Sequence, residues 1–171
     1  MNIAIVGATG NVGRKVLEVL ERKNLPISEV YLVASARSAG SKINFKGKDI
    51  EVENLETFDF SKAKITFFAA GGKISEAYAS KAANHSIVID NSSFYRMDPD
   101  VPLIVPQVNA DDLKNIKKNI IANPNCSTAQ LVLPLKPIHE LFKIKRVVAV
   151  SYTHLRAHET RGNVVCRLLL E

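Results

Sequence analysis

The stretch NIAIVGATGNVG, at residues 2–13, decides the fold of this chain. Apolar residues dominate its first five positions, which predicts a short buried strand over residues 2–6. A turn with two glycines follows at residues 7–10, and apolar side chains at helical spacing predict a helix over residues 11–22. The apolar face of that helix is expected to comprise Val12, Val16, Leu17 and Leu20. A strand, a glycine-rich turn and a helix in this order indicate the first unit of a parallel α/β sheet.

The rest of the chain continues this alternation of strands and helices. Further strands are expected at residues 29–34, 65–69, 86–89, 119–122 and 145–150, with a hairpin of residues 43–45 and 50–52 at the sheet edge. Helices are expected at residues 75–84, near residues 110–116, and from about Cys126 onward. Strands that alternate with helices favour βαβ units. We therefore predict an α/β fold with a Rossmann-like, doubly wound and mostly parallel sheet.

Length and composition are those of one globular domain. The 171 residues are 46% hydrophobic and 23% charged, and a chain of this length can bury its own core. No apolar run approaches the roughly 20 residues of a membrane span, and the first residues lack the basic start and cleavage site of a signal peptide. The two cysteines, Cys126 and Cys166, are too few for a disulfide framework and lack metal-ligand spacing. We expect a cytoplasmic protein with reduced thiols and no metal site.

The net charge of +6 suits an anionic ligand such as a phosphate. The positive residues occur in short groups along the chain, as at Lys114, Lys117 and Lys118, which we interpret as solvated helix surface. Nucleic-acid binding requires a clustered basic stripe with interleaved aromatic residues. The sequence has neither feature, and we expect no nucleic-acid or membrane partner.

The glycine turn has the spacing G-x-x-G-x-x-G, from Gly7 through Gly10 to Gly13, instead of G-x-G-x-x-G. Glycines allow the backbone to approach a pyrophosphate, and a helix start offers free N–H groups and a positive dipole end. The turn therefore predicts a dinucleotide site. A tight strand-to-helix turn without a ligand is the alternative.

The second expected strand ends in ASARSAG, at residues 34–40. NAD-binding folds usually place a carboxylate there, to accept hydrogen bonds from the ribose 2′-hydroxyl. This chain instead has Arg37, with the hydroxyls of Ser35 and Ser38 nearby in the sequence. A hydroxyl beside an arginine suits a 2′-phosphate, so we predict a preference for NADP. The alternative is that Arg37 is an ordinary loop cation.

Cys126 stands where the Asn-Pro-Asn segment of residues 123–125 ends and a helix is expected to begin. The start of a helix favours the thiolate form of a cysteine, and a thiolate is a nucleophile. The neighbouring N–H groups could also stabilise an oxyanion on a substrate attached to the sulfur. We predict that Cys126 is a catalytic nucleophile, the alternative being a buried and inert cysteine.

Arg96 follows the polar residues 90–93, which come directly after an expected strand. Open α/β sheets bind ligands on the side where their strands end. A guanidinium can hold a phosphate or carboxylate through two hydrogen bonds. We predict that Arg96 is an anion ligand, the alternative being a surface arginine without a ligand.

With these residues in place, the chain resembles the aspartate-β-semialdehyde dehydrogenase family over about residues 1–148, the amino-terminal part of such an enzyme. The matching stretches are GATGNVG (7–13), ASARSAG (34–40), AAGG (69–72), DNSS (90–93), RMDPDVPLIVPQVN (96–109) and NPNCST (123–128). The resemblance implies reversible, NADP-dependent interconversion of 4-phospho-L-aspartate and L-aspartate 4-semialdehyde. This reaction lies on the route to lysine, threonine and methionine.

The resemblance also implies residue roles. It makes Cys126 the nucleophile that forms an acyl thioester, and it makes Arg96 and Asn125 ligands of inorganic phosphate. The cofactor-binding residues that it implies are Gly7, Thr9, Gly10, Asn11, Val12, Ser35, Arg37, Ser38 and Gly72. Cys126 would attack the acyl phosphate, phosphate would leave toward Arg96, and NADPH would deliver hydride to the thioester. Phe94 and Tyr95 replace the alanine and phenylalanine that are usual in the family, which alters the expected shape of the phosphate pocket.

After Val148 the chain departs from the family. The family continues through a Ser-Thr-Tyr-Gln segment and a glycine-rich turn into a substrate and dimerisation domain, whereas residues 149–171 resemble a translated sequencing adapter. We expect residues 1–148 to form the NADP-binding domain, residues 149–171 to be a non-native and disordered tail, and the second domain to be missing. The family's general-base histidine and substrate-carboxylate arginine would lie in that missing domain. We therefore expect weak NADP binding without turnover, apolar surface exposed where the second domain would pack, and a homodimer only for the full-length enzyme.

Two other functions remain open. N-acetyl-γ-glutamyl-phosphate reductase shares the fold and the cysteine chemistry, although NPNCST and the ARSAG loop favour the aspartate enzyme. A non-catalytic NADP-sensing module could use the same fold. A Cys126 thiol that stays inert to iodoacetamide at about pH 6.5 would favour the sensor.

Overall fold

The computed structural model describes residues 1–23 and 25–149. The chain begins with β1 (Asn2–Val6), α1 (Asn11–Arg22), β2 (Glu29–Ala34), β3 (Lys42–Phe45) and β4 (Lys48–Asn54). A 3-10 helix, η1 (Phe60–Lys62), leads to β5 (Ile65–Phe68), α2 (Gly72–Ala83) and β6 (Ile87–Asp90). The last described elements are α3 (Pro106–Asn109), the 3-10 helix η2 (Ala110–Asn115), β7 (Ile120–Ala122) and α4 (Cys126–Phe142).

The strands of the described residues form one seven-stranded sheet in the order β3-β4-β2-β1-β5-β6-β7. Neighbouring strands are parallel, except for the antiparallel pair β3 and β4. From β1 the chain builds β2, β3 and β4 on one side, and it then crosses back to build β5, β6 and β7 on the other. A sheet that grows in both directions from its first strand is doubly wound, which confirms the predicted fold class.

The predicted hairpin at the sheet edge is present as β3 and β4. Its strands are joined by Lys46 and Gly47, whose φ angles are 51° and 76°. Two consecutive residues with positive φ match the right-handed twist of the flanking strands, which is why short hairpins favour glycine at such positions.

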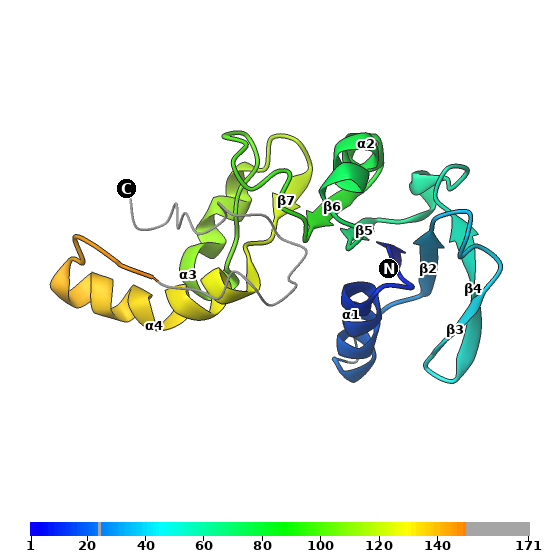
Figure 1. Cartoon of the computed structure of the whole chain (residues 1–171), viewed down its shortest axis with the longest axis horizontal. Helices are drawn as coiled ribbons and strands as arrows, with labels where there is room; N and C mark the ends of the chain where they lie inside the picture. Colours follow the sequence, from blue (N-terminus) through cyan, green and yellow to red (C-terminus); the bar gives the residue numbers. More distant parts are fainter. Residues whose placement is uncertain (24, 150–171) are drawn as a thin grey trace.

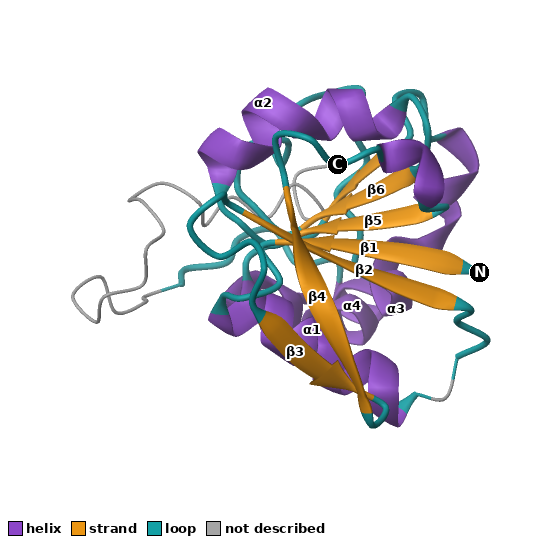
Figure 2. Cartoon of the chain, turned by 90° about the vertical axis from the view of Figure 1, so that its right-hand side faces the viewer, coloured by secondary structure: helices purple, strands orange, loops and turns teal. Residues whose placement is uncertain are grey.

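Two apolar layers cover the opposite faces of the sheet, with α1 on one side and α2 on the other (Figure 2). Leu17 of α1 packs in a cluster with Leu32 of β2. On the opposite face, Ala79 of α2 belongs to a cluster with Phe68 of β5. Both faces of the central strands are therefore buried, as expected of parallel strands with apolar residues on both faces.

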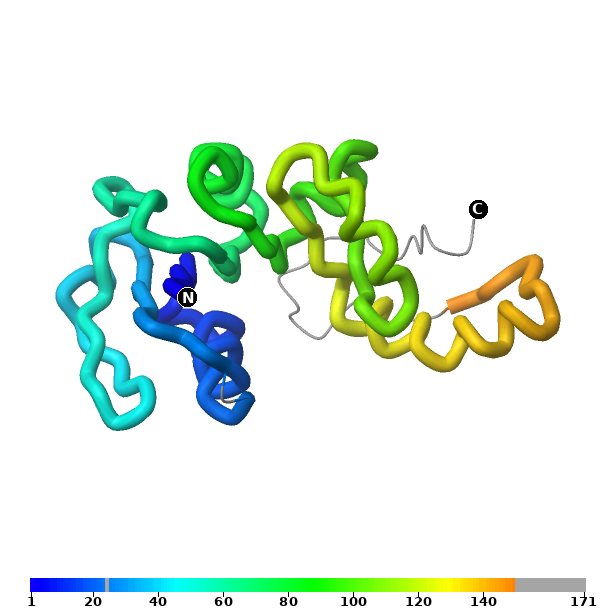
Figure 3. The backbone as a smooth tube through the Cα atoms, turned by 180° about the vertical axis from the view of Figure 1, so that it is seen from behind, coloured from blue at the N-terminus to red at the C-terminus, as the bar shows by residue number. Residues whose placement is uncertain are grey.

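The long axis of the molecule runs from the β3–β4 hairpin to the far end of α4 (Figures 1 and 3). Helix α4 begins beside β7 and extends away from the sheet, and its buried residues are Thr128 and Val132. Leu141 and Phe142 near its end are 76% and 77% exposed. The end of this helix therefore exposes apolar side chains, and the expectation that a second domain would pack on such surface stays a prediction.

The strand expected over residues 145–150 is wrong for residues 145–149, which form no strand, while residue 150 lies outside the described residues. The edge of β7 is already occupied by residues 102–104. Leu103 forms a parallel bridge with Ala122, and the Ile104 N–H donates to the Ala122 carbonyl over 3.0 Å. A further strand therefore has no partner at this edge, and unpaired backbone groups are costly to bury. The expected tail, from residue 150 on, also lies outside the described residues.

The helix expected near residues 110–116 is partly wrong. The structure has the short helix α3 followed by the 3-10 helix η2, and the break lies at Asn109, with φ −143° and ψ 43°. The Asn109 side chain accepts from the Val105 N–H and donates to the Leu103 carbonyl, both at 2.9 Å. An asparagine that bonds to nearby backbone in this way competes with helical hydrogen bonds and ends the helix.

The spacing predicts that Val12 lies on the apolar face of α1. This prediction is wrong, because the Val12 side chain is 44% exposed. The next residue, Gly13, is the one that faces the turn, because a Cβ placed on it would lie 2.3 Å from the Gly7 carbonyl oxygen. Successive residues of a helix point about 100° apart. The close contact at Gly13 therefore turns Val12 toward solvent at the start of the helix.

Candidate active site

The candidate site lies along the edge of the sheet where the parallel strands β1, β2, β5, β6 and β7 end. The winding direction reverses between β1 and β5, because β2 lies on one side of β1 and β5 on the other. Open α/β sheets bind their ligands outside the carboxyl ends of the strands, at such a switch point. The site residues predicted from the sequence all follow strands that end at this edge.

The glycine turn, residues 7–13, needs glycine at two positions for steric reasons. Gly7 has φ 85°, and a Cβ on it would lie 2.8 Å from the Ala69 carbonyl carbon and 2.9 Å from the Ala70 nitrogen. A Cβ on Gly13 would lie 2.3 Å from the Gly7 carbonyl oxygen. Because of these close approaches, Gly7 lies directly against the turn after β5. The start of α1 likewise lies directly against the Gly7 carbonyl.

Two helices at the switch point begin without a side-chain cap. The N-cap residues are Gly10 for α1 and Gly71 for α2, and neither first turn contains an acidic residue. The first N–H groups of a helix have no partner within the helix, and they carry its positive dipole end. The two starts can therefore donate to an anion, and this donor set fits the phosphates of a dinucleotide.

Three residues predicted for the cofactor lie at the start of α1. Thr9 is half-buried in the turn, and its carbonyl accepts from the Nε of Arg14 over 3.2 Å. Asn11 and Val12 are exposed in the first helical turn. Gly72, predicted for the same cofactor, is the first residue of α2. The structure therefore brings these residues to neighbouring helix starts.

The loop after β2 folds back on itself. The Ser35 carbonyl accepts from the N–H groups of Ser38 and Ala39 over 2.8 and 3.1 Å, and the Ser38 carbonyl accepts from the Ser41 hydroxyl over 2.7 Å. Arg37 lies within this turn with an exposed side chain. The loop can therefore present the arginine and the Ser35 hydroxyl to a ligand at the end of β2.

Asp90, the last residue of β6, is fully buried and accepts hydrogen bonds at both carboxylate oxygens. Its Oδ1 accepts from the Ser75 hydroxyl over 2.8 Å and from the Ser92 N–H over 2.9 Å, and its Oδ2 accepts from the Ser92 hydroxyl over 2.7 Å. Ser75 belongs to α2 and Ser92 to the loop after β6. The carboxylate therefore joins a helix, a strand and a loop at the site.

Arg96, predicted as an anion ligand, is 6% exposed and binds the backbone of two loops. Its Nε donates to the Asn123 carbonyl over 2.9 Å, and its Nη2 donates to the Asn91 carbonyl over 3.2 Å. The Asn123 side-chain amide in turn donates to Oδ1 of Asn91. The structure therefore places Arg96 beside the segment that leads to Cys126.

The cysteine turn, residues 123–126, ends at the first residue of α4. Cys126 is an exposed, free thiol, and its Sγ lies 3.7 Å from Oδ1 of Asn125. The same Oδ1 accepts from the Ser127 N–H over 2.9 Å, so Asn125 caps the helix with its side chain. The prediction of a helix that begins at Cys126 is confirmed. The thiol thus lies at a helix start, where it is accessible to a substrate.

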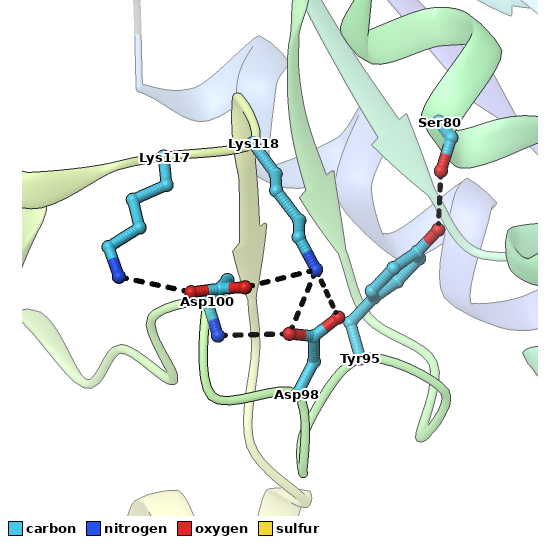
Figure 4. Close-up of polar contacts among 6 residues, drawn as sticks. All are labelled: Ser80, Tyr95, Asp98, Asp100, Lys117 and Lys118. Atoms are coloured by element: carbon cyan, nitrogen blue, oxygen red, sulfur yellow. Dashed lines mark hydrogen bonds and ion pairs between the residues drawn. The ribbon is translucent and has the colours of Figure 1, made fainter.

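A group of ion pairs lies at the other end of β7 (Figure 4). Lys118 binds Asp98 over 2.9 Å, and Lys117 binds Asp100 over 3.0 Å. The hydrogen bond from Lys117, followed by the charges of Lys117 and Lys118, lowers the pKa of Asp100. The hydrogen bond to Asp98 raises the pKa of Lys118. These pairs hold the loop after β6 to the residues that precede β7.

Sequence reasoning missed the supporting residues of the site. Asp90, Asn91 and Asn123 lie within stretches that resemble the family, but the sequence predicts no role for them. The signal available was a run of polar side chains directly after a buried strand. Ser75 has no sequence signal, because its partner Asp90 is 15 residues away and meets it only in the folded chain.

The described residues contain neither a membrane-spanning helix nor a group of metal ligands. No helix within residues 1–23 or 25–149 is long and apolar enough to cross a membrane. In the same residues, no three side chains of histidine, cysteine, aspartate or glutamate are grouped so that they could hold a metal ion.

Known proteins match most of this chain. Residues 2–116 match the family model described as semialdehyde dehydrogenase, NAD binding domain. Aspartate-semialdehyde dehydrogenase of Aquifex aeolicus (strain VF5) is 54% identical over 153 residues, which cover 88% of this chain and 45% of that relative. The chain therefore spans about half the length of the curated relatives that it matches.

Solved structures of related enzymes match the fold of this chain. The crystal structure of aspartate semialdehyde dehydrogenase II complexed with ASA from Vibrio cholerae has a TM-score of 0.80 and 48% identity, covering 82% of this chain and 46% of that one. Aspartate semialdehyde dehydrogenase with NADP from Candida albicans has a TM-score of 0.63 and 30% identity, covering 81% and 46%. The family model includes the glycine turn, the loop after β2 and Arg96, and it ends before Cys126.

Proposed function

The chain belongs to the semialdehyde dehydrogenase family through its NAD-binding domain, and we propose that it supplies the cofactor site and the cysteine nucleophile of an aspartate-semialdehyde dehydrogenase. The proposed reaction is the NADP-dependent reductive dephosphorylation of 4-phospho-L-aspartate to L-aspartate 4-semialdehyde. It would serve lysine, threonine and methionine synthesis in the cytoplasm. The observation that carries the proposal is Cys126, an exposed free thiol at the first residue of α4. The names of relatives at 45% to 54% identity support the aspartate substrate.

The proposed cofactor site begins at the glycine turn. The uncapped N–H groups of α1 and α2 would hold the pyrophosphate, with Thr9, Asn11 and Val12 at its rim. The proposed 2′-phosphate ligand is Arg37, together with hydroxyls of the loop after β2. This part of the proposal is supported by the exposure of Arg37 and by the absence of any carboxylate from residues 34–40.

In the proposed mechanism the Cys126 sulfur attacks the acyl carbon of the phosphorylated aspartate. The bond to phosphate breaks and a thioester forms on the sulfur. The N–H groups at the start of α4 would stabilise the oxyanion, and the positive charge of Arg96, beside the cysteine turn, would favour the departing phosphate with help from Asn125. NADPH, when bound, supplies the hydride that reduces the thioester to the aldehyde.

The chain by itself is proposed to lack turnover. The general base and the residue that holds the substrate carboxylate would come from the part of the family's enzymes that this chain does not span. The exposed apolar surface of α4, which includes Leu141 and Phe142, supports a partner domain there in the full-length enzyme. A homodimer is likewise proposed for that full-length enzyme. Turnover by the purified 171-residue chain with NADPH would contradict this part of the proposal.

The experiment that tests the proposal is alkylation of Cys126 in a Cys166→Ser background, which leaves one thiol to report. The expected result is that iodoacetamide modifies Cys126 at about pH 6.5 faster than it modifies the same chain unfolded in urea, because a catalytic nucleophile is more reactive than an ordinary thiol. NADP should slow the reaction by covering the sulfur. A thiol that is inert at this pH, with or without NADP, would overturn the catalytic proposal in favour of a non-catalytic NADP-binding module.

A further inference from the structure

Asn123 is bound through its backbone N–H, its backbone carbonyl and its side-chain NH2 group. Its N–H donates to the Asp90 carbonyl over 2.8 Å, and its carbonyl accepts from the Nε of Arg96 over 2.9 Å. Its side-chain amide donates to Oδ1 of Asn91. A residue held at its N–H, its carbonyl and its side chain has no backbone or side-chain rotation left without breaking a hydrogen bond.

Asn123 directly follows β7 and precedes Cys126 by three residues. The residue between Asn123 and Asn125 is Pro124, whose ring fixes its own φ and restricts the backbone of the residue before it. Asn125 then caps α4 by accepting from the Ser127 N–H over 2.9 Å. The chain between the sheet and the Cys126 sulfur is therefore fixed at each residue, starting from Asn123.

The residues that bind Asn123 come from the loop after β6, which is itself anchored. Arg96 is 6% exposed, and a charged donor gives a stronger hydrogen bond to a carbonyl than a neutral one. The Arg96 guanidinium donates to both the Asn91 and the Asn123 carbonyl, so it connects the loop after β6 to the cysteine turn. The base of that loop is held by the buried Asp90 carboxylate through Ser92.

We propose that Asn91, Arg96 and Asn123 form a clamp that positions the Cys126 sulfur at the start of α4. In this role the three residues do not take part in the chemistry. They are positioning residues that act through the backbone of the cysteine turn. The proposal rests on the proposed function in one respect, which is that a fixed sulfur matters only if Cys126 is the nucleophile. Arg96 thereby gains a role that is independent of any phosphate.

The test compares Asn91→Ala with Asn91→Asp in the full chain, both in the Cys166→Ser background. Alanine removes the acceptor for the Asn123 amide, whereas aspartate keeps an oxygen at the same place. A matched control is Ser80→Ala, which removes the hydrogen bond of 2.9 Å between the Ser80 and Tyr95 hydroxyls (Figure 4). That bond also anchors the loop after β6, but it does not touch the cysteine turn.

The first measurement is the order parameter of the Cys126 amide from ¹⁵N relaxation. In the parent chain and in Ser80→Ala we expect about 0.85, the value of rigid backbone, and in Asn91→Ala a fall below about 0.6. Asn91→Asp should restore the rigid value. An unchanged order parameter in Asn91→Ala would overturn the clamp. If Asn91→Ala fails to fold, Arg96→Lys replaces it with the same expected fall, because lysine keeps the charge but lacks the fork that reaches both carbonyls.

The second measurement is the pH profile of Cys126 alkylation. In Asn91→Ala we expect the rate at about pH 6.5 to fall about fivefold, toward that of the unfolded chain, while Ser80→Ala keeps the parent profile. A parent profile equal to that of the unfolded chain would overturn the proposed function, and the order parameters would still decide the clamp. If the parent profile differs from that of the unfolded chain and Asn91→Ala keeps the parent profile, the clamp is overturned and the proposed function stands.

Discussion

The helices that follow β1 and β7 both begin at the same edge of the sheet, but they are held there by different means. The glycine turn before α1 relies on backbone shape, since a Cβ on Gly7 or Gly13 would meet main-chain atoms closer than 3.0 Å. The cysteine turn before α4 relies on side chains, because Asn91, Arg96 and Asn125 supply its hydrogen bonds. A turn that must leave its N–H groups open for an anion cannot use side chains to fill them. The cysteine turn uses a side chain in this way at one position, where Asn125 accepts from the Ser127 N–H while the turn fixes the sulfur atom.

The largest expected effect follows from the backbone contact at the glycine turn. Gly13→Ala should destabilise the chain by about 3 kcal/mol or more, because the new Cβ would lie 2.3 Å from the Gly7 carbonyl oxygen and backbone atoms cannot move aside cheaply. Urea unfolding measures the change. The matched control is Gly72→Ala, also in the first turn of a helix, where the nearest atom to a Cβ is the Ser93 hydroxyl oxygen at 3.8 Å. Equal losses in the two variants would show that the contact does not matter.

The side-chain network beneath the cysteine turn gives the next largest effect. Asp90→Ala should cost about 2 to 3 kcal/mol, because it leaves the Ser75 and Ser92 donors without their acceptor in a buried place. Asp59→Ala is the control, since Asp59 also accepts from an N–H two residues on but is exposed. Urea midpoints that shift alike in the two variants would contradict the importance of the buried network.

The glycine turn could be predicted from the sequence, and the support of the cysteine turn could not. The strand, the turn and the helix of residues 2–22 are local, so hydrophobic spacing and glycine positions determine them. The bonds from Arg96 to Asn123 and from Asn123 to Asn91 join residues 27 and 32 positions apart, and no local pattern encodes such pairs. The expected strand is absent over residues 145–149 for a related reason. Its pattern was apolar, but whether the sheet edge was open depended on residues 102–104.

The cofactor side of the comparison is tested by Arg37→Ala. Loss of a charge-assisted hydrogen bond to the 2′-phosphate should weaken NADP binding by about tenfold or more and leave NAD binding nearly unchanged. Calorimetric titration with each nucleotide measures this. The alkylation rate of Cys126 without nucleotide should stay at the parent value, because Arg37 follows β2 and lies in a different turn. Equal weakening of NADP and NAD would remove the assignment of Arg37.

Asn125→Ala should have a smaller effect, confined to the cysteine turn. It removes the side-chain cap of α4 and should cost about 1 kcal/mol in urea unfolding. Asn125→Ser offers a comparable cap and should recover most of the loss. The glycine turn has no side-chain cap to lose, so NADP affinity should be the same in both variants. A fall in NADP affinity in Asn125→Ala would show that the two turns are coupled.

The smallest expected effect comes from the ion pairs at the far end of β7, and it depends on pH. The hydrogen bond from Lys117 and the charges of Lys117 and Lys118 lower the pKa of Asp100 from its ordinary value of 3.8. A carboxylate with a lower pKa in the folded chain stabilises the fold fully above its unfolded pKa, and this contribution disappears as the pH falls through the folded value. Asp100→Asn should therefore lower the urea midpoint slightly at about pH 7 and match the parent chain at about pH 2.

The same variant separates the two ends of β7. Its stability difference should shrink in high salt, because the pair of Lys117 and Asp100 is exposed and salt screens exposed charges. Asp111→Asn is the control, since the Asp111 side chain in its pair with Lys114 is 90% exposed and should contribute even less. The Cys126 amide should keep its order parameter in both variants, because Asn123 and not the ion pairs holds the cysteine turn. A loss of order at Cys126 in Asp100→Asn would mean that the whole loop after β6, rather than the three clamp residues, positions the sulfur.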